Sequence, residues 1–247
     1  DRSPSRGLGD VYKRQSQYRP YGEHYNIPMI SMGDGITKYF DEDGFYDWYF
    51  GDRLHPNNRG YKLMSDCIMN LMDTVDNAQA DTDNITDIDA MAPKTTAAYQ
   101  GMKMIDANTK AEDDDALISI DAGSFTAKDS ATGNFQYEYK GQKSASWFAD
   151  NWMHTKDAAN DALTVKLNCK TLMFVYKLSS SDSFGPADVY IDGEKKGTLN
   201  GYDSSGWNNG KVFVAMTNEE VAEHTIEIKM ADKSAAKNFT LMAIGFN

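Results

Sequence analysis

The stretch that decides the fold reads Leu163-Thr164-Val165-Lys166-Leu167 and, after four intervening residues, Leu172-Met173-Phe174-Val175-Tyr176. Apolar and polar residues alternate in the first run, which is typical of a strand with one face on a core. Further strand-like runs lie at residues 117–120, 135–139, 188–191, 212–214, 225–230 and 239–244. About eight short strands in this part of the chain predict an all-β sandwich, a jelly roll.

The sandwich is expected to span residues 93–247, and residues 93–105 are expected to supply its first strand. The pair Asp192-Gly193 directly follows one strand-like run and predicts a hairpin turn. Residues 76–92 are acidic and polar, and we predict that they form a linker.

The residues before this linker show a different pattern of apolar and polar residues. Residues 27–32 form a short apolar run without alternation, which predicts a strand buried on both faces of a parallel sheet. Residues 36–50 are expected to form a loop and a short helix. A helix is predicted next, with Asn57 or Asn58 as its N-cap. Its apolar stripe recurs at helical spacing and consists of Tyr61, Met64, Ile68, Leu71 and Val75.

Asp52 and His55 lie in the loop before this predicted helix. Ligands usually meet open α/β sheets on the side where the strands end, so this loop is a candidate site. An imidazole titrates near neutral pH and can take a proton from a hydroxyl and return it. A neighbouring carboxylate can hold the ring in one tautomer. The alternative is an ordinary helix-capping aspartate beside a surface histidine.

The stretches 25–32 and 52–57, followed by Gly60-Tyr61, resemble the last conserved block of the SGNH (GDSL) hydrolases. This resemblance covers residues 16–75 and implies the C-terminal end of an α/β/α, flavodoxin-like domain. It also implies a serine esterase in which His55 is the general base and Asp52 orients it. The whole chain is therefore expected to be multidomain, with the end of a hydrolase domain followed by the sandwich.

The serine nucleophile of this family lies in a Gly-Asp-Ser motif, which the sequence lacks; residues 33–35 read Gly-Asp-Gly. We therefore expect the chain to be a fragment without esterase activity of its own, because the histidine has no hydroxyl to activate. Residues 1–15 are basic in an acidic chain and resemble translated sequencing-adapter read-through. We predict that they are a non-native artefact.

The stretches 189–193 and 223–228, with Gly206-Trp207 between them, resemble galactose-binding-like sandwiches. The resemblance implies a carbohydrate-binding domain of the kind that accompanies bacterial glycan esterases. Flat aromatic faces bind sugar rings, and the candidate residues in polar, loop-like stretches are Trp147, Trp152, Tyr202 and Trp207. Trp147 and Trp152 have a second interpretation, in which they cap the sandwich core. We expect His154 at the surface and structural roles for His24 and His224.

Composition excludes some partners. The 247 residues carry a formal net charge of −12, which disfavours binding to nucleic acid. No apolar run approaches the ~20 residues that span a bilayer. Cys67 and Cys169 are expected to be buried free thiols. No cofactor or metal is expected; although five aspartates could offer oxygens to calcium, solvated turns are the default for Asp121, Asp129, Asp182, Asp188 and Asp192.

The favoured function is a carbohydrate O-acetyl esterase acting on an acylated polysaccharide or oligosaccharide. Two alternatives remain: a non-catalytic carbohydrate-binding module, and a lipid-directed lipase or esterase of the GDSL type. The family resemblance implies an extracellular or cell-surface location.

Overall fold

The computed structural model describes residues 18–32, 44–52, 55–79, 87–95, 97–132, 138–139, 142–143 and 148–247. The chain forms two compact units, Asp1–Thr96 and Ala97–Asn247, which we describe separately. The predicted linker 76–92 and the domain boundary at residue 93 remain predictions. The stretch 1–15 lies outside the described residues, so its predicted origin is not tested.

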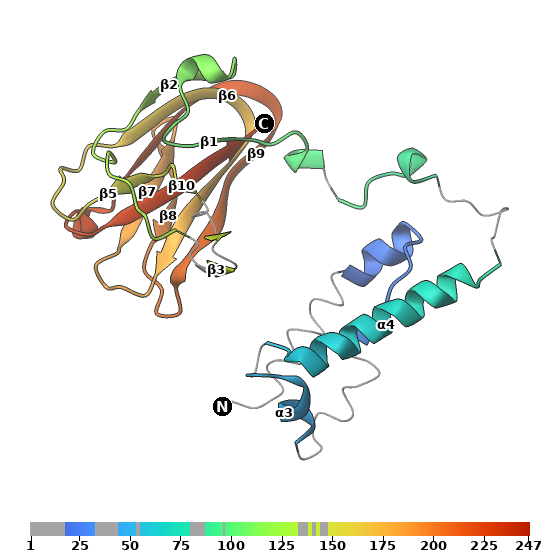
Figure 1. The fold of residues 1–247 in the computed structure, drawn as a ribbon. Helices are drawn as coiled ribbons and strands as arrows, with labels where there is room; N and C mark the ends of the chain where they lie inside the picture. The colour runs from blue at the N-terminus through green and yellow to red at the C-terminus, as the bar shows by residue number, and fades with distance from the viewer. Residues whose placement is uncertain are drawn as a thin grey trace. The chain divides into compact units, whose positions relative to one another are not determined.

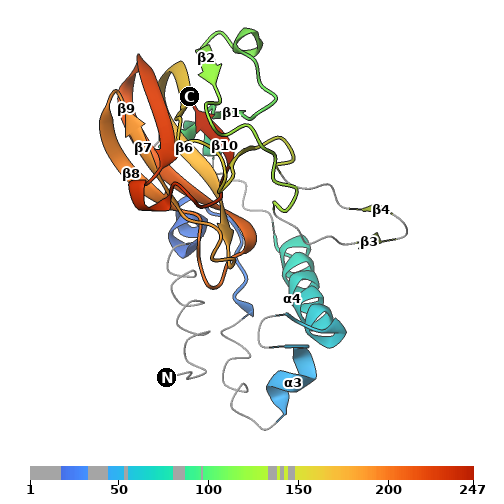
Figure 2. The same ribbon diagram turned by 90° about the vertical axis from the view of Figure 1, so that its left-hand side faces the viewer.

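Helices dominate the described part of the first unit. Residues 18–24 are helical, and two further helices follow, α3 (Phe45–Tyr49) and α4 (Asn58–Asp76). The long helix α4 is seen in Figure 2. Its predicted N-cap is confirmed, because the Asn57 side chain accepts hydrogen bonds from the backbone N–H groups of Arg59 and Gly60. A short 3-10 helix, η2 (Ile88–Ala90), lies near the end of the unit.

The strand predicted at residues 27–32 is not formed. Residues 27–31 belong to no strand, and the side chains of Ile27 and Met29 are about half exposed. A strand exists only where its backbone groups find a ladder partner. Within the described part of the first unit, no strand pairs with these residues.

The second unit is built of strands (Figure 1). They are β1 (Lys103–Ile105), β2 (Leu117–Asp121), β3 (Glu138–Tyr139), β4 (Gln142–Lys143), β5 (Trp152–His154), β6 (Leu163–Ser179), β7 (Pro186–Ile191), β8 (Glu194–Asn200), β9 (Trp207–Met230) and β10 (Phe239–Phe246). Short 3-10 helices occur at η3 (Ala97–Tyr99), η4 (Ala111–Asp113) and η5 (Asp232–Ser234).

The two longest strands, β6 and β9, run antiparallel from Leu163 opposite Ile228 to Ser179 opposite Trp207. The main path of the sheet is β1-β10-β6-β9-β7-β8, while β2 pairs with β6 and β5 pairs with β10. The first part of β6 pairs with β2, and its second part pairs with β10. Register shifts interrupt the β6–β9 ladder near Cys169 and Thr171. Both strands therefore pass from one layer of the sandwich to the other.

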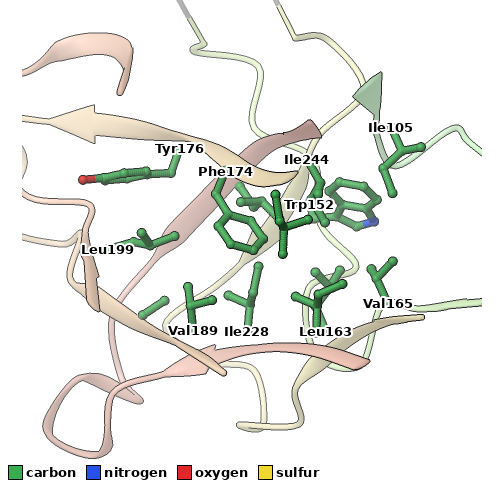
Figure 3. Packing of buried hydrophobic residues seen from close by; sticks show 14 of the residues in the cluster. Ile105, Trp152, Leu163, Val165, Phe174, Tyr176, Val189, Leu199, Ile228 and Ile244 are labelled. Atoms are coloured by element: carbon green, nitrogen blue, oxygen red, sulfur yellow. The ribbon is translucent and has the colours of Figure 1, made fainter. Parts of the chain in front are cut away.

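The core lies between these two layers. Figure 3 shows Leu163, Val189 and Ile228 on one side, facing Phe174 and Ile244 on the other. All five residues are fully buried, with 0 % of their surface exposed. The predicted alternation of β6 places its inward-facing residues in this layer, so burial of its apolar side chains stabilises the whole sandwich.

The predicted hairpin is also confirmed. Asp192 and Gly193 have φ angles of 53° and 80°, and they join β7 to β8. Positive φ at both central residues is the geometry that favours Asp-Gly in a tight turn.

Candidate functional site

Asp52 and His55 form a hydrogen-bonded pair just before α4. Asp52 Oδ2 lies 2.8 Å from His55 Nδ1. The other carboxylate oxygen, Oδ1, accepts a hydrogen bond of 2.6 Å from the backbone N–H of His55. An ionised carboxylate only accepts, so Nδ1 carries a proton and donates it to Asp52. One aspartate thus holds both the backbone and the ring of the histidine.

The second ring nitrogen of His55 is the chemically available one. The His55 and Asp52 side chains are 64 % and 58 % exposed. Within the described part of the chain, His55 Nε2 has no hydrogen-bond partner. With Nδ1 protonated, Nε2 of the neutral ring presents a lone pair, and it can accept a proton from a hydroxyl and later return it.

A short closed loop presents this pair. The backbone N–H of Gly51 donates to the carbonyl of His55 at 2.9 Å, and the N–H of Asn57 donates to the carbonyl of Tyr49 at 2.9 Å. An isolated bridge joins Phe50 to Pro56 between these two bonds. Backbone contacts therefore hold residues 49–51 beside residues 55–57, and one of them uses the carbonyl of His55 itself.

The glycine of the Gly60-Tyr61 pair has a steric explanation. A Cβ atom on Gly60 would lie 2.3 Å from the carbonyl oxygen of Tyr49. Only glycine lets the first turn of α4 approach α3 this closely. Arg59 adds a cation–π contact, with its guanidinium carbon 3.7 Å from the ring centroid of Trp48. The neighbouring helices thus fix where the loop with Asp52 and His55 begins and ends.

The four aromatic candidates for sugar binding have different environments. Tyr202 and Trp207 are 39 % and 50 % exposed. Trp152 is only 3 % exposed and belongs to the core cluster. It cannot present a ring face to a ligand, so its second interpretation, core packing, describes the structure. Trp147 lies outside the described residues.

The surface prediction for His154 is wrong. The residue is 0 % exposed on β5. Its Nε2 lies 2.7 Å from the carbonyl oxygen of Ala159, and its Nδ1 lies 3.1 Å from that of Lys237. His154 ties two loops to the sheet. In contrast, His24 and His224 have the expected structural contacts, with the Ala92 carbonyl and the Asp192 carboxylate respectively.

Three of the five aspartates considered for calcium form ion pairs. Asp129 pairs with Lys177, Asp188 with Lys195, and Asp192 with His224. The hydrogen bond from His224 is the largest influence on Asp192 and holds the pKa of its carboxyl below the usual value. Across the described residues, no group of three histidine, cysteine or acidic side chains could hold a metal ion.

The most deeply buried charge pair was not anticipated from the sequence. Lys177 Nζ lies 2.7 Å from Asp129 Oδ2, and the two side chains are 3 % and 7 % exposed. Thr240 donates to the same carboxylate oxygen at 2.7 Å. Burial alone raises the pKa of Asp129, but hydrogen bonds from Lys177, Thr240 and the Ala131 backbone N–H outweigh it and hold the pKa below its usual value.

Both cysteines are free thiols, as expected. Cys169 is buried, whereas Cys67 on α4 is only half-buried. Burial, with the negative charge of Asp192, raises the pKa of Cys169 to about 11. Its thiol is therefore protonated at neutral pH and is not a nucleophile.

Comparison with known proteins finds likeness only in structure. No protein-family model matches the chain, and no curated protein matches it. A crystal structure of a two-domain esterase, CEX, active on acetylated mannans is 18 % identical over 94 % of this chain and 58 % of its own, with a TM-score of 0.66. The same esterase co-crystallised with mannopentaose is 17 % identical over the same shares, with a TM-score of 0.63.

A family 35 carbohydrate-binding module from an environmental isolate matches 57 % of this chain and 90 % of its own, at 11 % identity. Its TM-score is 0.35.

The first two comparisons establish the fold. The expected fold, the remnant of an α/β domain followed by an all-β sandwich, is confirmed at this level. The chain spans 58 % of the length of the two-domain esterase. None of the described helices is long and apolar enough to cross a membrane.

Proposed function

We propose that this chain carries the histidine–aspartate pair of an SGNH-type serine esterase that removes acyl groups, chiefly acetyl, from carbohydrate. The observation that carries the proposal is the two-point contact between Asp52 and His55. This contact favours the tautomer in which the Nδ1 N–H donates to the carboxylate of Asp52, so that Nε2 can take part in proton transfer.

In this proposal, His55 Nε2 takes the proton of a serine hydroxyl as the hydroxyl attacks the ester carbonyl. The protonated ring then returns the proton to the sugar oxygen that leaves, and the acyl group stays on the serine. Water, deprotonated by the same Nε2, attacks the acyl-serine, which releases the carboxylate and restores the serine hydroxyl. Asp52 keeps the ring oriented and stabilises its positive charge. The serine and the oxyanion donors are supplied by a segment outside this sequence. The absence of a Gly-Asp-Ser motif and the 58 % coverage of the two-domain esterase support that assignment.

The proposed substrate is a neutral, acetylated glycan, bound in part by the sandwich. Two observations support it: the chain carries a net charge of −12, and the structurally similar esterase CEX is active on acetylated mannans. The proposed layout is a hydrolase segment at residues 16–75, a linker at 76–92 and a carbohydrate-binding domain at 93–247. Such an enzyme would work outside the cell or at its surface.

The test is acetate release from acetylated glucomannan by a protein that joins this chain to the upstream part of its gene. His55→Ala and Asp52→Asn should each lower kcat by about 10⁴-fold, because the general base or its orientation is lost. Lys62→Gln on α4, which breaks only an exposed ion pair with Asp66, is the matched control and should leave kcat unchanged.

The chain as it stands should not hydrolyse an activated acetyl ester. Turnover by this chain that disappears in His55→Ala would contradict the assignment of the nucleophile to another segment. Equal rates for the extended protein and its His55→Ala variant would contradict the esterase proposal itself. Preference for tributyrin over acetylated glucomannan would instead support the lipid-directed alternative.

A further inference from the structure

Two exposed aromatic residues of the sandwich lie in register with one small residue of β6. Ser179 is paired with Trp207 of β9 in the antiparallel ladder. Ser179 also forms an isolated parallel bridge with Tyr202. Directly paired residues of a sheet point their side chains toward the same face. However, the β6–β9 register shifts between Leu178 and Ser179, so the pairings fix where the two aromatic residues lie and not the direction of their rings. Ser179 itself is buried, whereas Tyr202 and Trp207 are exposed beside it.

The two aromatic residues lie on opposite sides of β6. The backbone N–H of Ser179 donates to the Gly201 carbonyl at 2.9 Å, and its carbonyl accepts from the Asp203 N–H at 2.9 Å. Both backbone groups of Ser179 thus face the strand edge that carries Tyr202. Trp207 lies across the other edge, so two strand spacings, roughly 10 Å, separate the backbones of the two aromatic residues.

The loop that carries this pair is held by its backbone. Gly201 N–H donates to the Gly185 carbonyl at 3.2 Å, and Gly206 N–H donates to the Asp203 carbonyl at 2.8 Å. A Cβ atom on Gly206 would lie 2.8 Å from the carbonyl carbon of Leu178, so the loop lies directly on β6. Binding a ligand here would cost little ordering of the loop.

The chemistry of the pair fits a sugar chain. Tyr202 and Trp207 are 39 % and 50 % exposed, and aromatic faces pack against the C–H surfaces of pyranose rings. In an extended β-1,4-linked chain, alternate units turn the same face to one side, and they are separated by one disaccharide. That length is close to the roughly 10 Å between the two backbones.

The charge of the surroundings selects against acidic sugars. Asp203 directly follows Tyr202 in sequence, and hydrogen bonds from the Ser205 side chain and backbone hold the pKa of its carboxyl below the usual value. The whole chain carries a net charge of −12. Lys211 offsets part of the charge of Asp203. The net charge of the chain still repels a uronate, whereas it does not repel a neutral hexose.

We propose that Tyr202 and Trp207 form a binding platform for a neutral, linear β-1,4-linked hexopyranose chain, with one aromatic ring under each of two alternate sugar units. The inference rests on the proposed carbohydrate binding by the sandwich. It adds to that function the residues that make contact, and the charge and minimum length of the ligand.

Calorimetric titration of the full chain tests the platform, with mannohexaose, cellohexaose and mannobiose as probes. A hexaose should bind at least about 10-fold more tightly than mannobiose, because only the longer chain reaches both rings. Tyr202→Ala and Trp207→Ala should each weaken hexaose binding about 10-fold and reduce the advantage of length. Trp207→Phe should retain part of the affinity. Tyr99→Ala, at a tyrosine that is 50 % exposed elsewhere on the unit, is the matched control.

The outcomes separate the platform from the proposed function. Hexaose binding that survives both alanine substitutions would overturn the platform, while glycan binding by the chain would stand. Tighter binding of oligogalacturonate than of either hexaose would overturn the neutral ligand class. Failure to bind any of these glycans would remove the carbohydrate-binding part of the proposed function and the platform with it. Acetate release that depends on His55 would still decide the esterase part. Matching thermal unfolding midpoints show that the variants are folded.

Discussion

The ion pair between Lys177 and Asp129 buries two charges inside the sandwich. Both side chains are almost fully buried, and the carboxylate also accepts hydrogen bonds from Thr240 and the Ala131 backbone N–H. The Lys177 ammonium lies 4.5 Å from the centroid of the Phe184 ring. Each charge is compensated, so the pair stabilises the fold only while both partners are present.

Replacing Lys177 by methionine should therefore destabilise the protein by about 3–5 kcal/mol, because Asp129 would remain as an unpaired buried charge. Urea denaturation measures the loss. Lys128→Met is the control, since Lys128 pairs with Asp150 near the surface and such pairs contribute about 1 kcal/mol or less. Similar losses of unfolding free energy in both variants would show that the buried pair contributes no more to stability than the exposed one.

The same carboxylate should make stability depend on pH. The pKa of Asp129 is lower in the folded state than its usual value, so the folded state favours the ionised form. This contribution is complete above the unfolded pKa of about 4 and is lost as the pH falls through the lower folded value. Unfolding free energies measured from pH 6 to pH 2 should fall less steeply in Asp129→Asn than in the unsubstituted protein. Parallel curves would contradict this.

At this scale, prediction from sequence succeeds for contacts within a few residues. The hydrogen bonds between Asp52 and His55 join groups three positions apart, and the local pattern indicates them. The environments of Trp152 and His154 depend instead on β10 and on the loop near Lys237, far away in sequence. Polar neighbours make the segment around Trp152 look like a loop, so its burial could not be inferred.

Among the elements, the long strands differ most from expectation. Residues 163–167 and 172–176 are predicted as two strands, and residues 212–214 and 225–230 as two more. The structure joins each pair into one strand, β6 and β9. Polar residues around position 170 resemble a turn in the sequence. They belong to the bend where both strands change layers, and the ladder between the strands, not local propensity, keeps them extended.

The close approach of the β6 backbone should make glycine necessary at position 206. A Cβ atom there would lie within 2.9 Å of the backbone carbonyl oxygen of Leu178, and backbone atoms cannot move aside as a side chain can. Gly206→Ala should lower stability by about 1–3 kcal/mol in thermal or urea unfolding. Gly210→Ala, in the strand β9 that begins directly after Gly206, meets the Val175 and Met242 side chains and should cost less. A larger loss at Gly210 would contradict the steric argument.

Over the whole molecule, the sequence predicts the fold class of each part. It does not predict which of the expected strands form. Strand periodicity and the Asp-Gly turn indicate the sandwich because its buried face lies within residues 97–247. The strand expected at residues 27–32 fails for the opposite reason. A parallel sheet is defined by neighbouring strands, and the described residues offer none to pair with it.

The unit Ala97–Asn247 should therefore fold by itself. Its core cluster is drawn entirely from its own residues, so burial of that core does not depend on the first unit. Expressed alone, it should unfold in one transition, with coincident midpoints by far-UV circular dichroism and tryptophan fluorescence. Separate midpoints, or a midpoint well below that of the full chain, would show that the sandwich needs the preceding residues.

The pairing of β1 with β10 places the beginning of the sandwich beside its end, with Lys103 opposite Phe246. The Asn247 side chain adds hydrogen bonds to the carbonyls of Ala98 and Gln100. Polypeptide that enters and leaves this module does so at a single point on its surface. Such a module can be grafted into a loop of another protein without stretching its host. A circular permutant that joins the two ends and opens the hairpin at Gly193 should keep the same architecture.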